Sequence, residues 1–161
     1  MNIPFSPPDI GENEIAEVVE ALRSGWITTG PRTKELERQV ATFCGTERAV
    51  CLNSQTACAE MALRLLGIGP GDEVIVPAPY FPEYKVFIEG AGAKMVLIPP
   101  EIENFQINFA AFEAAITPNT KMLFVETPTN PCMKVADIAA ISEIAKSIGA
   151  LTVVDNTFLT P

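Results

Sequence analysis

The sequence contains no histidine among its 161 residues. This absence excludes Ser-His-Asp triads, histidine acid–base chemistry and the metal ligand that proteins use most often. The cysteines include no CxxC pair, so they predict reduced thiols of a cytoplasmic protein rather than a disulfide framework or a metal site. The four cysteines are Cys44, Cys51, Cys58 and Cys132.

Long apolar runs and an excess of positive charge are also missing. No apolar stretch is long enough to span a bilayer, and the start MNIPFSPPDIGENE has neither the basic nor the apolar region of a signal peptide. Acidic residues outnumber basic ones by 20 to 11, which gives a net charge of −9. A surface of that sign repels phosphate backbones and anionic lipids, so neither nucleic acid nor a membrane is expected as a partner.

The composition is otherwise that of a folded domain, with 48% hydrophobic and 19% charged residues. Short apolar runs alternate with segments of helical periodicity, which predicts a three-layer α/β/α fold with a mainly parallel sheet of about five strands. The expected strands are 49–53, 71–79, 93–100, 121–126 and 150–156. Two further helices are expected at 12–24 and 33–43, joined by the irregular stretch GWITTGPRT. We therefore predict an N-terminal helical segment at 1–45 and one α/β domain at 46–161.

Polar residues follow the first expected strand. Ser54, Gln55, Thr56 and Ala57 lead directly into a helix, whose free N–H groups and dipole suit a phosphate group. Taken alone, these residues are better explained by an ordinary helix cap by Ser54 or Thr56. Neither GxGxxG nor GxxxxGK[ST] is present, which disfavours a generic nucleotide-binding domain.

Three more strand ends carry candidate site residues. Phe81 is a flat aromatic that can stack on a ring, although it can also simply cover the sheet. Asn130 lies between two prolines and presents an amide, but Asn-Pro is also common turn chemistry. Asp155 provides a carboxylate at the end of its strand. Taken alone, Asp155 is better explained as a cap or turn residue. In parallel sheets these ends share one edge, so together they suit a planar, phosphorylated, nitrogen-bearing cofactor.

At these motifs the chain resembles the large domain of fold-type-I pyridoxal-phosphate (PLP) transferases, the aspartate aminotransferase superfamily. Residues 1–78, from IPFSPPDIGENE to GDEVIVPA, resemble nucleotide-sugar aminotransferases. Residues 79–122, with PYFPEY, resemble class I/II aminotransferases, and 123–161, with FVETPTNP and VVDNTFLTP, resemble the cystathionine synthase and lyase family. The change of family within one chain favours an engineered chimera or a consensus-like design over gradual divergence.

The resemblance implies roles for single residues. Gln55, Thr56 and Ala57, with Ser54 nearby, would line the cofactor phosphate, although many relatives have a smaller residue in place of Gln55. Phe81 would stack on the ring, Asn130 would donate to its phenolic oxygen, and Asp155 would pair with the pyridine nitrogen. The implied reaction is amino-group transfer through an aldimine, from an amino donor to a keto acceptor, in a homodimer.

One expected group is missing from the sequence. The resemblance implies a Schiff-base lysine roughly two dozen residues after Asp155, and no lysine follows that position. The lysines present are Lys34, Lys85, Lys94, Lys121, Lys134 and Lys146. We therefore expect a part of a PLP-binding large domain, without its C-terminal part and small domain, that binds the cofactor weakly and turns over little or no substrate. The alternative is a designed or recombined α/β scaffold that has no ligand and no enzymatic role.

The resemblance also implies that strand 49–53 lacks its usual neighbour. Three outcomes are open for it: pairing beside strand 121–126, burial of its edge in an oligomer, or a poorly stable chain.

Overall fold

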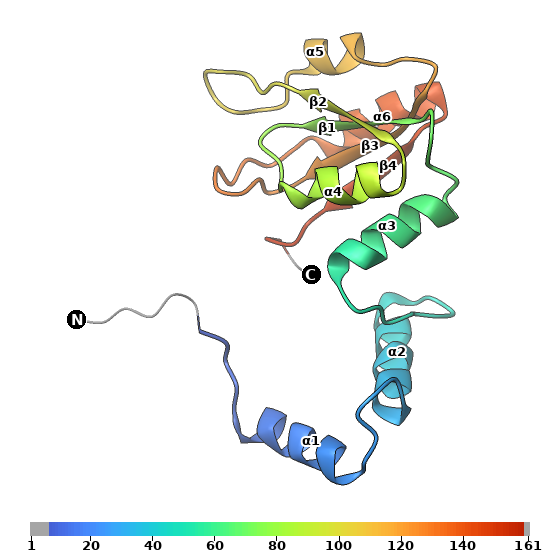
Figure 1. Cartoon of the computed structure of the whole chain (residues 1–161). Coiled ribbons are helices and arrows are strands. Elements are labelled where there is room, and N and C mark those ends of the chain that lie inside the picture. Colours follow the sequence, from blue (N-terminus) through green and yellow to red (C-terminus); the bar gives the residue numbers. More distant parts are fainter. Residues whose placement is uncertain (1–6, 160–161) are drawn as a thin grey trace, which may run out of the picture. The chain divides into compact units, whose positions relative to one another are not determined.

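The computed structural model describes residues 7–159, so the outermost parts of the two predicted domain ranges, 1–6 and 160–161, lie outside the described residues. The chain forms two compact units, the first ending at Cys51 and the second beginning at Leu52 (Figure 1). No helix within the described residues is both long and apolar enough to cross a bilayer.

The first unit contains two helices, close to the predicted positions. Helix α1 covers Glu12–Arg23 and helix α2 covers Pro31–Cys44. Glu14 accepts a hydrogen bond from the Gly11 backbone N–H at 2.7 Å, which satisfies one of the free donors at the start of α1. Proline at the first position of α2 is suited to a helix start, and Gly45 ends α2 with a left-handed φ of 66°.

The second unit is the α/β domain. Its elements in chain order are α3 (Gln55–Leu65), β1 (Glu73–Pro77), α4 (Glu83–Gly90), β2 (Lys94–Ile98), α5 (Phe109–Ala114), β3 (Thr120–Glu126), α6 (Ile138–Ile148) and β4 (Leu151–Asp155). The four strands lie in the order β2-β1-β3-β4, and every pair is parallel. The predicted fold class is confirmed.

Helices cover both faces of this sheet (Figure 1). One buried cluster joins α3 and α4 to the sheet through residues such as Leu63, Phe87 and Phe124. The other joins α5 and α6 to the opposite face through Phe112, Ile141 and their neighbours. Strand β1 is buried along its whole length, as expected of a strand with helices on both sides.

The expected strand at 49–53 does not form, so the sheet has four strands instead of about five. Val50 is 73% exposed and Leu52 42% exposed. An isolated extended segment leaves its N–H and C=O groups unpaired, and a strand exists only where a neighbour pairs with them. Pairing beside β3 does not occur either, because β1 and β4 occupy its two sides.

The sheet order fixes where the strand ends meet. β1 leads to β2 on one side, and the chain then returns to β3 on the other side of β1. The crevice beyond the carboxyl ends at such a switch point is where parallel sheets bind ligands. The last residues of β3 and β4, Glu126 and Asp155, are register partners at this edge.

Candidate functional site

Asp155 is held at the end of β4 by three hydrogen bonds. Its Oδ1 accepts from the Thr157 hydroxyl at 2.5 Å and from the Thr157 backbone N–H at 3.0 Å. Its Oδ2 accepts from the Tyr84 hydroxyl at 2.6 Å. Burial opposes ionisation of this half-buried carboxyl, but the bonds from Thr157 and Tyr84 outweigh it and hold the pKa of Asp155 below its ordinary value. Asp155 is therefore an oriented carboxylate at neutral pH.

Tyr84 supplies one of these donors from helix α4. Its side chain is fully buried, and its ring lies 4.6 Å from that of Phe124 and 5.6 Å from that of Phe87. Burial, followed by the hydrogen bond to Asp155 and the nearby acidic charges, raises the pKa of the Tyr84 hydroxyl far above its ordinary value. The hydroxyl consequently stays a donor at every physiological pH.

Glu126 lies beside Asp155 and is even more buried, with 7% of its surface exposed. Its Oε2 atom is buried and has no hydrogen-bond partner among the described residues. Burial first, and then the negative charge of Asp155, raise the pKa of Glu126, while the backbone N–H of Asn130 acts in the opposite direction. A carboxyl in this environment resists ionisation.

The predicted phosphate-binding residues form the first turn of α3. Ser54 is the N-cap, and its Oγ accepts from the Ala57 backbone N–H at 3.1 Å. The N–H groups of Gln55 and Thr56 have no intrahelical acceptor at this position in a helix, and they are available to an anion. The Thr56 hydroxyl donates to Glu83, at the start of α4, over 3.5 Å. The cap and the predicted phosphate-binding residues thus belong to the same turn.

A cleft of about 370 Å³ links this turn to Asp155. Gln55 borders it on one side, Asp155 and Thr157 border it on the other, and Phe124 and Val153 contribute apolar surface. This volume is within the range of small-molecule sites, which are mostly apolar with a few polar groups. Of the predicted site residues, the structure therefore brings Gln55 and Asp155 to one cleft, whereas Ser54, Thr56 and Ala57 do not line it.

Phe81 and Asn130 lie on the loops after β1 and β3. Phe81 is 41% exposed and packs edge-on against Tyr84, with 6.0 Å between ring centroids. Asn130 is exposed, and its backbone N–H acts on Glu126. Neither residue borders the cleft next to Asp155. Their predicted contacts to a cofactor ring stay predictions.

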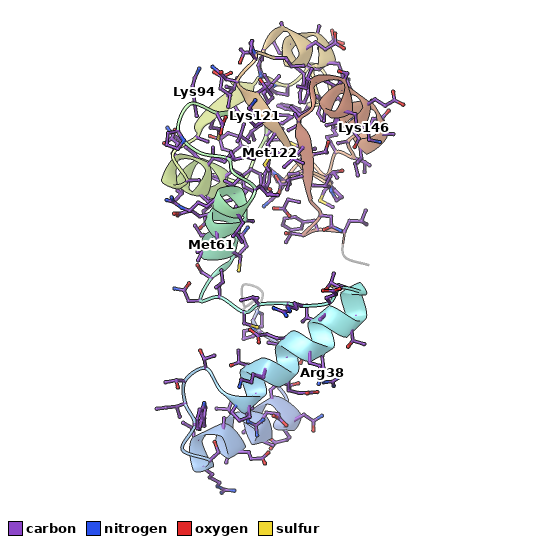
Figure 2. All side chains as sticks on the ribbon, turned by 90° about the vertical axis from the view of Figure 1, so that its right-hand side faces the viewer. Arg38, Met61, Lys94, Lys121, Met122 and Lys146 are labelled. Atoms are coloured by element: carbon purple, nitrogen blue, oxygen red, sulfur yellow. The ribbon has the colours of Figure 1, made fainter. Side chains whose placement is uncertain are left out.

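The lysines of the α/β unit lie mostly away from these strand ends. Lys94 is the first residue of β2, Lys121 follows the first residue of β3, and Lys146 lies in the last turn of α6, just before β4 begins (Figure 2). All three are therefore at the amino end of the strands. Lys134 differs, because it borders a water-sized cavity together with Glu126 and Thr129. Lys85 lies in the first turn of α4, next to Tyr84 in the sequence, and forms an ion pair with Glu89.

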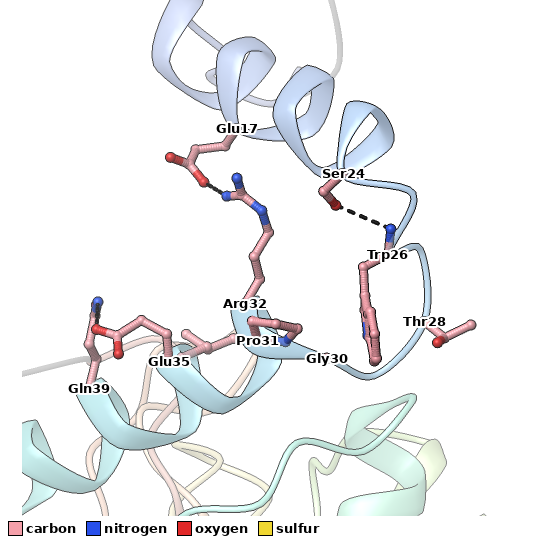
Figure 3. A pocket seen from close by; sticks show the side chains of 10 residues that line it. Glu17, Ser24, Trp26, Thr28, Gly30, Pro31, Arg32, Glu35 and Gln39 are labelled. Carbon is pink, nitrogen blue, oxygen red and sulfur yellow. Dashed lines mark hydrogen bonds and ion pairs between the residues drawn. The ribbon is translucent and has the colours of Figure 1, made fainter.

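A second cleft, of about 680 Å³, lies between α1 and α2 within the first unit (Figure 3). The stretch GWITTGPRT forms part of its wall. Trp26 donates its indole N–H to the Thr29 carbonyl at 2.9 Å, and Arg32 forms ion pairs with Glu17 and Glu20. The polar groups of this wall are already paired with one another. We therefore interpret the cleft as part of the folded connection between α1 and α2 and not as a ligand site.

Comparison with known proteins identifies the family. The family model described as DegT/DnrJ/EryC1/StrS aminotransferase matches residues 8–157. The chain belongs to this aminotransferase family. The single match extends across both positions where the sequence motifs change in character, near residues 78 and 122.

Solved structures support the same assignment. Spr1654 of Streptococcus pneumoniae, described as a sugar aminotransferase, is 45% identical in its PMP form, with 91% of this chain and 36% of that chain covered and a TM-score of 0.79. Its PLP form is 43% identical, with 98% and 40% covered and a TM-score of 0.79. DesV of S. venezuelae, in complex with a ketimine intermediate, is 34% identical, with 88% and 37% covered and a TM-score of 0.73.

The chain thus spans 36% to 40% of the length of the chains in these three structures. Its resemblance to nucleotide-sugar aminotransferases and to fold-type-I PLP enzymes is confirmed, and the α/β unit corresponds to part of such a domain.

Two site residues were not predicted from the sequence. Tyr84 had no site role assigned from the sequence, and Glu126 was only the last residue of the expected strand 121–126. Helical spacing of Tyr84, Phe87 and Ile88 is a signal for the former, since it places all three on the buried face of α4. For Glu126, the signal is an acidic residue that ends an apolar strand without a basic residue nearby.

Proposed function

We propose that this chain is the cofactor-binding part of a PLP-dependent aminotransferase. The observation that carries the proposal is the shared cleft, which Gln55 of the first turn of α3 and the ionised Asp155 both border. A phosphate on one side and a protonated ring nitrogen on the other are the two groups that these elements recognise. Family membership supplies the same cofactor independently.

The residues fit PLP. The N–H groups at the start of α3 and the Ser54 hydroxyl would hold the phosphate, and Thr56 and Ala57 belong to the same turn. Each Asp155 oxygen has two lone pairs, so Oδ2 can accept from a ring N–H while keeping the bond from Tyr84. When bound, PLP supplies an electron sink that stabilises negative charge developing on the substrate. Asp155 would keep the ring nitrogen protonated.

We further propose that the partner substrates are an amino donor and a keto acceptor, with a keto sugar as the acceptor class, and that this chain alone has little or no turnover. The support for the substrate class is its similarity to proteins described as sugar aminotransferases. The support for low turnover is that Lys94, Lys121 and Lys146 lie at the amino ends of the strands, away from Asp155.

Titration with PLP, followed by absorbance and thermal shift, tests the binding proposal. Asp155→Asn removes the charge that the ring nitrogen needs, which is worth about 1.5–3 kcal/mol for a charge-assisted bond, so PLP should bind roughly 10- to 100-fold more weakly. Asp9→Asn, an exposed change in the first unit, is the matched control and should leave the affinity unchanged. Equal affinity of the wild-type and Asp155→Asn chains would contradict the assigned role.

Borohydride reduction and mass spectrometry test the proposal that the chain lacks a Schiff-base lysine. We expect no stoichiometric covalent adduct, because no lysine is positioned as the Schiff-base lysine of the superfamily is expected to be. A one-to-one adduct on Lys134, lost in Lys134→Met, would show instead that this chain carries its own Schiff-base amine.

The alternative is an α/β scaffold without a ligand. Cofactor titration decides between the two, because a scaffold gives no thermal shift with PLP in any variant.

We also propose that the chain forms a homodimer, as the resemblance implies. Large apolar side chains are exposed in both units, among them Phe43 at 80% and Leu65 at 81%. Light scattering after size exclusion should give twice the chain mass of 17.3 kDa. A monomer at micromolar concentration would refute this assignment.

A further inference from the structure

Glu126 is a buried acid whose role the proposed phosphate and ring contacts leave unexplained. It is 7% exposed, and its Oε2 lacks a hydrogen-bond partner among the described residues. A buried polar group without a partner is destabilising, and a charged one is more so. Such a residue at the carboxyl end of a strand calls for a functional explanation.

The sheet register places Glu126 directly beside Asp155. The two are Cα partners at the ends of the parallel strands β3 and β4. Phe124 and Val153, two residues earlier on each strand, are partners as well. Phe124 and Val153 both pack in the cluster formed with α3 and α4. Side chains two residues apart on a strand share a face, so Glu126 and Asp155 point to that same side of the sheet.

The two carboxyls differ in the donors that surround them. Asp155 accepts three hydrogen bonds, from Tyr84 and Thr157, whereas Oε2 of Glu126 accepts none. Two adjacent carboxylates repel each other in a poorly solvated site, and one of them then keeps its proton. The difference in donors decides which one, because three hydrogen bonds stabilise a negative charge on Asp155, whereas the Asn130 backbone N–H is the single donor that acts on Glu126 within the described residues. The directions of the two pKa shifts agree with this distribution.

We propose that Glu126 and Asp155 form a coupled carboxyl pair, in which Glu126 takes up a proton before Asp155 does and the negative charge of the singly protonated pair lies on the Asp155 oxygens. Glu126 is a positioning residue that acts on a cofactor ring through Asp155. The cofactor half of this inference rests on the proposed function, whereas the pair itself is a property of the chain without any ligand. The titratable and charged groups that face Glu126 are Asp155 on β4, Tyr84 on α4 and Lys134 on the loop after β3.

Carboxyl ¹³C NMR titration of the chain without cofactor tests the pair. The Glu126 signal should titrate above the ordinary glutamate value of 4.5, and the Asp155 signal below the ordinary aspartate value of 3.8. In Asp155→Asn the Glu126 midpoint should fall by roughly one pH unit, because a neighbouring negative charge is gone. Glu113→Gln, an exposed change on α5, should leave both midpoints in place.

A Glu126 midpoint at or below 4.5, or one that Asp155→Asn leaves unchanged, overturns the inference. The wild-type titration stands by itself if a variant fails to fold, which circular dichroism reports.

Titration of the Glu126→Gln chain with PLP adds a second readout. Glutamine has the shape and neutrality of the protonated acid, so at a pH between the two carboxyl midpoints the affinity should stay within about threefold of wild type, well short of the tenfold that 1.4 kcal/mol represents. A loss as large as that of Asp155→Asn would mean that Glu126 acts as a second carboxylate, against the proposal. If PLP binds to no variant while the carboxyl titrations behave as expected, the pair stands and the proposed function fails.

Discussion

The hydrogen bond between Tyr84 and Asp155 ties helix α4 to the end of β4, and its removal gives a quantitative test of the site. Tyr84→Phe deletes only the hydroxyl that donates to Asp155 Oδ2 at 2.6 Å. The phenyl ring can keep its packing against Phe87 and Phe124, so no cavity term is added. The loss is confined to one charge-assisted hydrogen bond.

Hydrogen bonds to charged groups contribute about 1.5–3 kcal/mol. Asp155 is half-buried, so water can partly replace the lost donor, and the two bonds from Thr157 remain. We therefore expect the free energy of unfolding to fall by about 1.5–2 kcal/mol at pH 7, toward the lower end of that range. Tyr80→Phe is the matched control, because Tyr80 is the other tyrosine and lies half-buried beside Tyr84.

The loss should depend on pH. Because the folded-state pKa of Asp155 is lowered from 3.8, its stabilising contribution is fully present above that value and is lost as the pH falls through the folded-state pKa. Tyr84 contributes part of this lowering, so the difference between wild type and Tyr84→Phe should be largest above about pH 5 and shrink at lower pH. Urea unfolding across this range measures it. A difference below about 0.5 kcal/mol at pH 7, or one independent of pH, would refute the reasoning.

Three further predictions concern other contacts. A Cβ at Gly30 would lie 1.8 Å from the Trp26 indole nitrogen, so Gly30→Ala should displace the ring, break its bond to Thr29 and shift the emission of the single tryptophan. Glu73→Gln should lose about 1–2 kcal/mol at pH 7, since hydrogen bonds from Lys94 and Thr117 lower the pKa of this buried acid, and the loss should disappear in urea unfolding as the pH falls below 4.5. Ser54→Ala should cost about 1 kcal/mol by removing the cap of α3, whereas Ser54→Gly should cost only a few tenths, as urea unfolding can measure.

The α/β architecture was predictable because its signals are local. Four apolar runs bounded by turns became the four parallel strands, and each connecting periodic segment became a helix. Helix α6 shows why this works, because Asp137 caps it by accepting from the Ala140 N–H at 3.0 Å and Gly149 ends it at a φ of 69°. Ile141 and Ala145 lie on its buried face, and their separation of four residues is the spacing that predicts one face of a helix.

The expected strand at 49–53 shows where local signals fail. Its apolar residues suit a strand, but a strand also requires an edge that accepts it, and that requirement is not written in the segment itself. Val50 and Leu52 are exposed, and the two neighbouring positions beside β3 are already filled. Partner choice depends on contacts between distant segments, which periodicity does not encode.

Of the two acids at the sheet edge, Asp155 could be predicted as a site residue from the sequence and Glu126 could not, for a related reason. Asp155 stood out because it ends an apolar run, and its position alone made it a candidate. What sets its charge is less visible, since Tyr84 comes from another element and Glu126 matters only through the register of β3 and β4. Taken alone, Tyr84 is only a buried tyrosine and Glu126 only an acid at a strand end. At the strand ends, Tyr84 and Glu126 together keep the negative charge on the Asp155 carboxylate. A protonated ring nitrogen would recognise that charge.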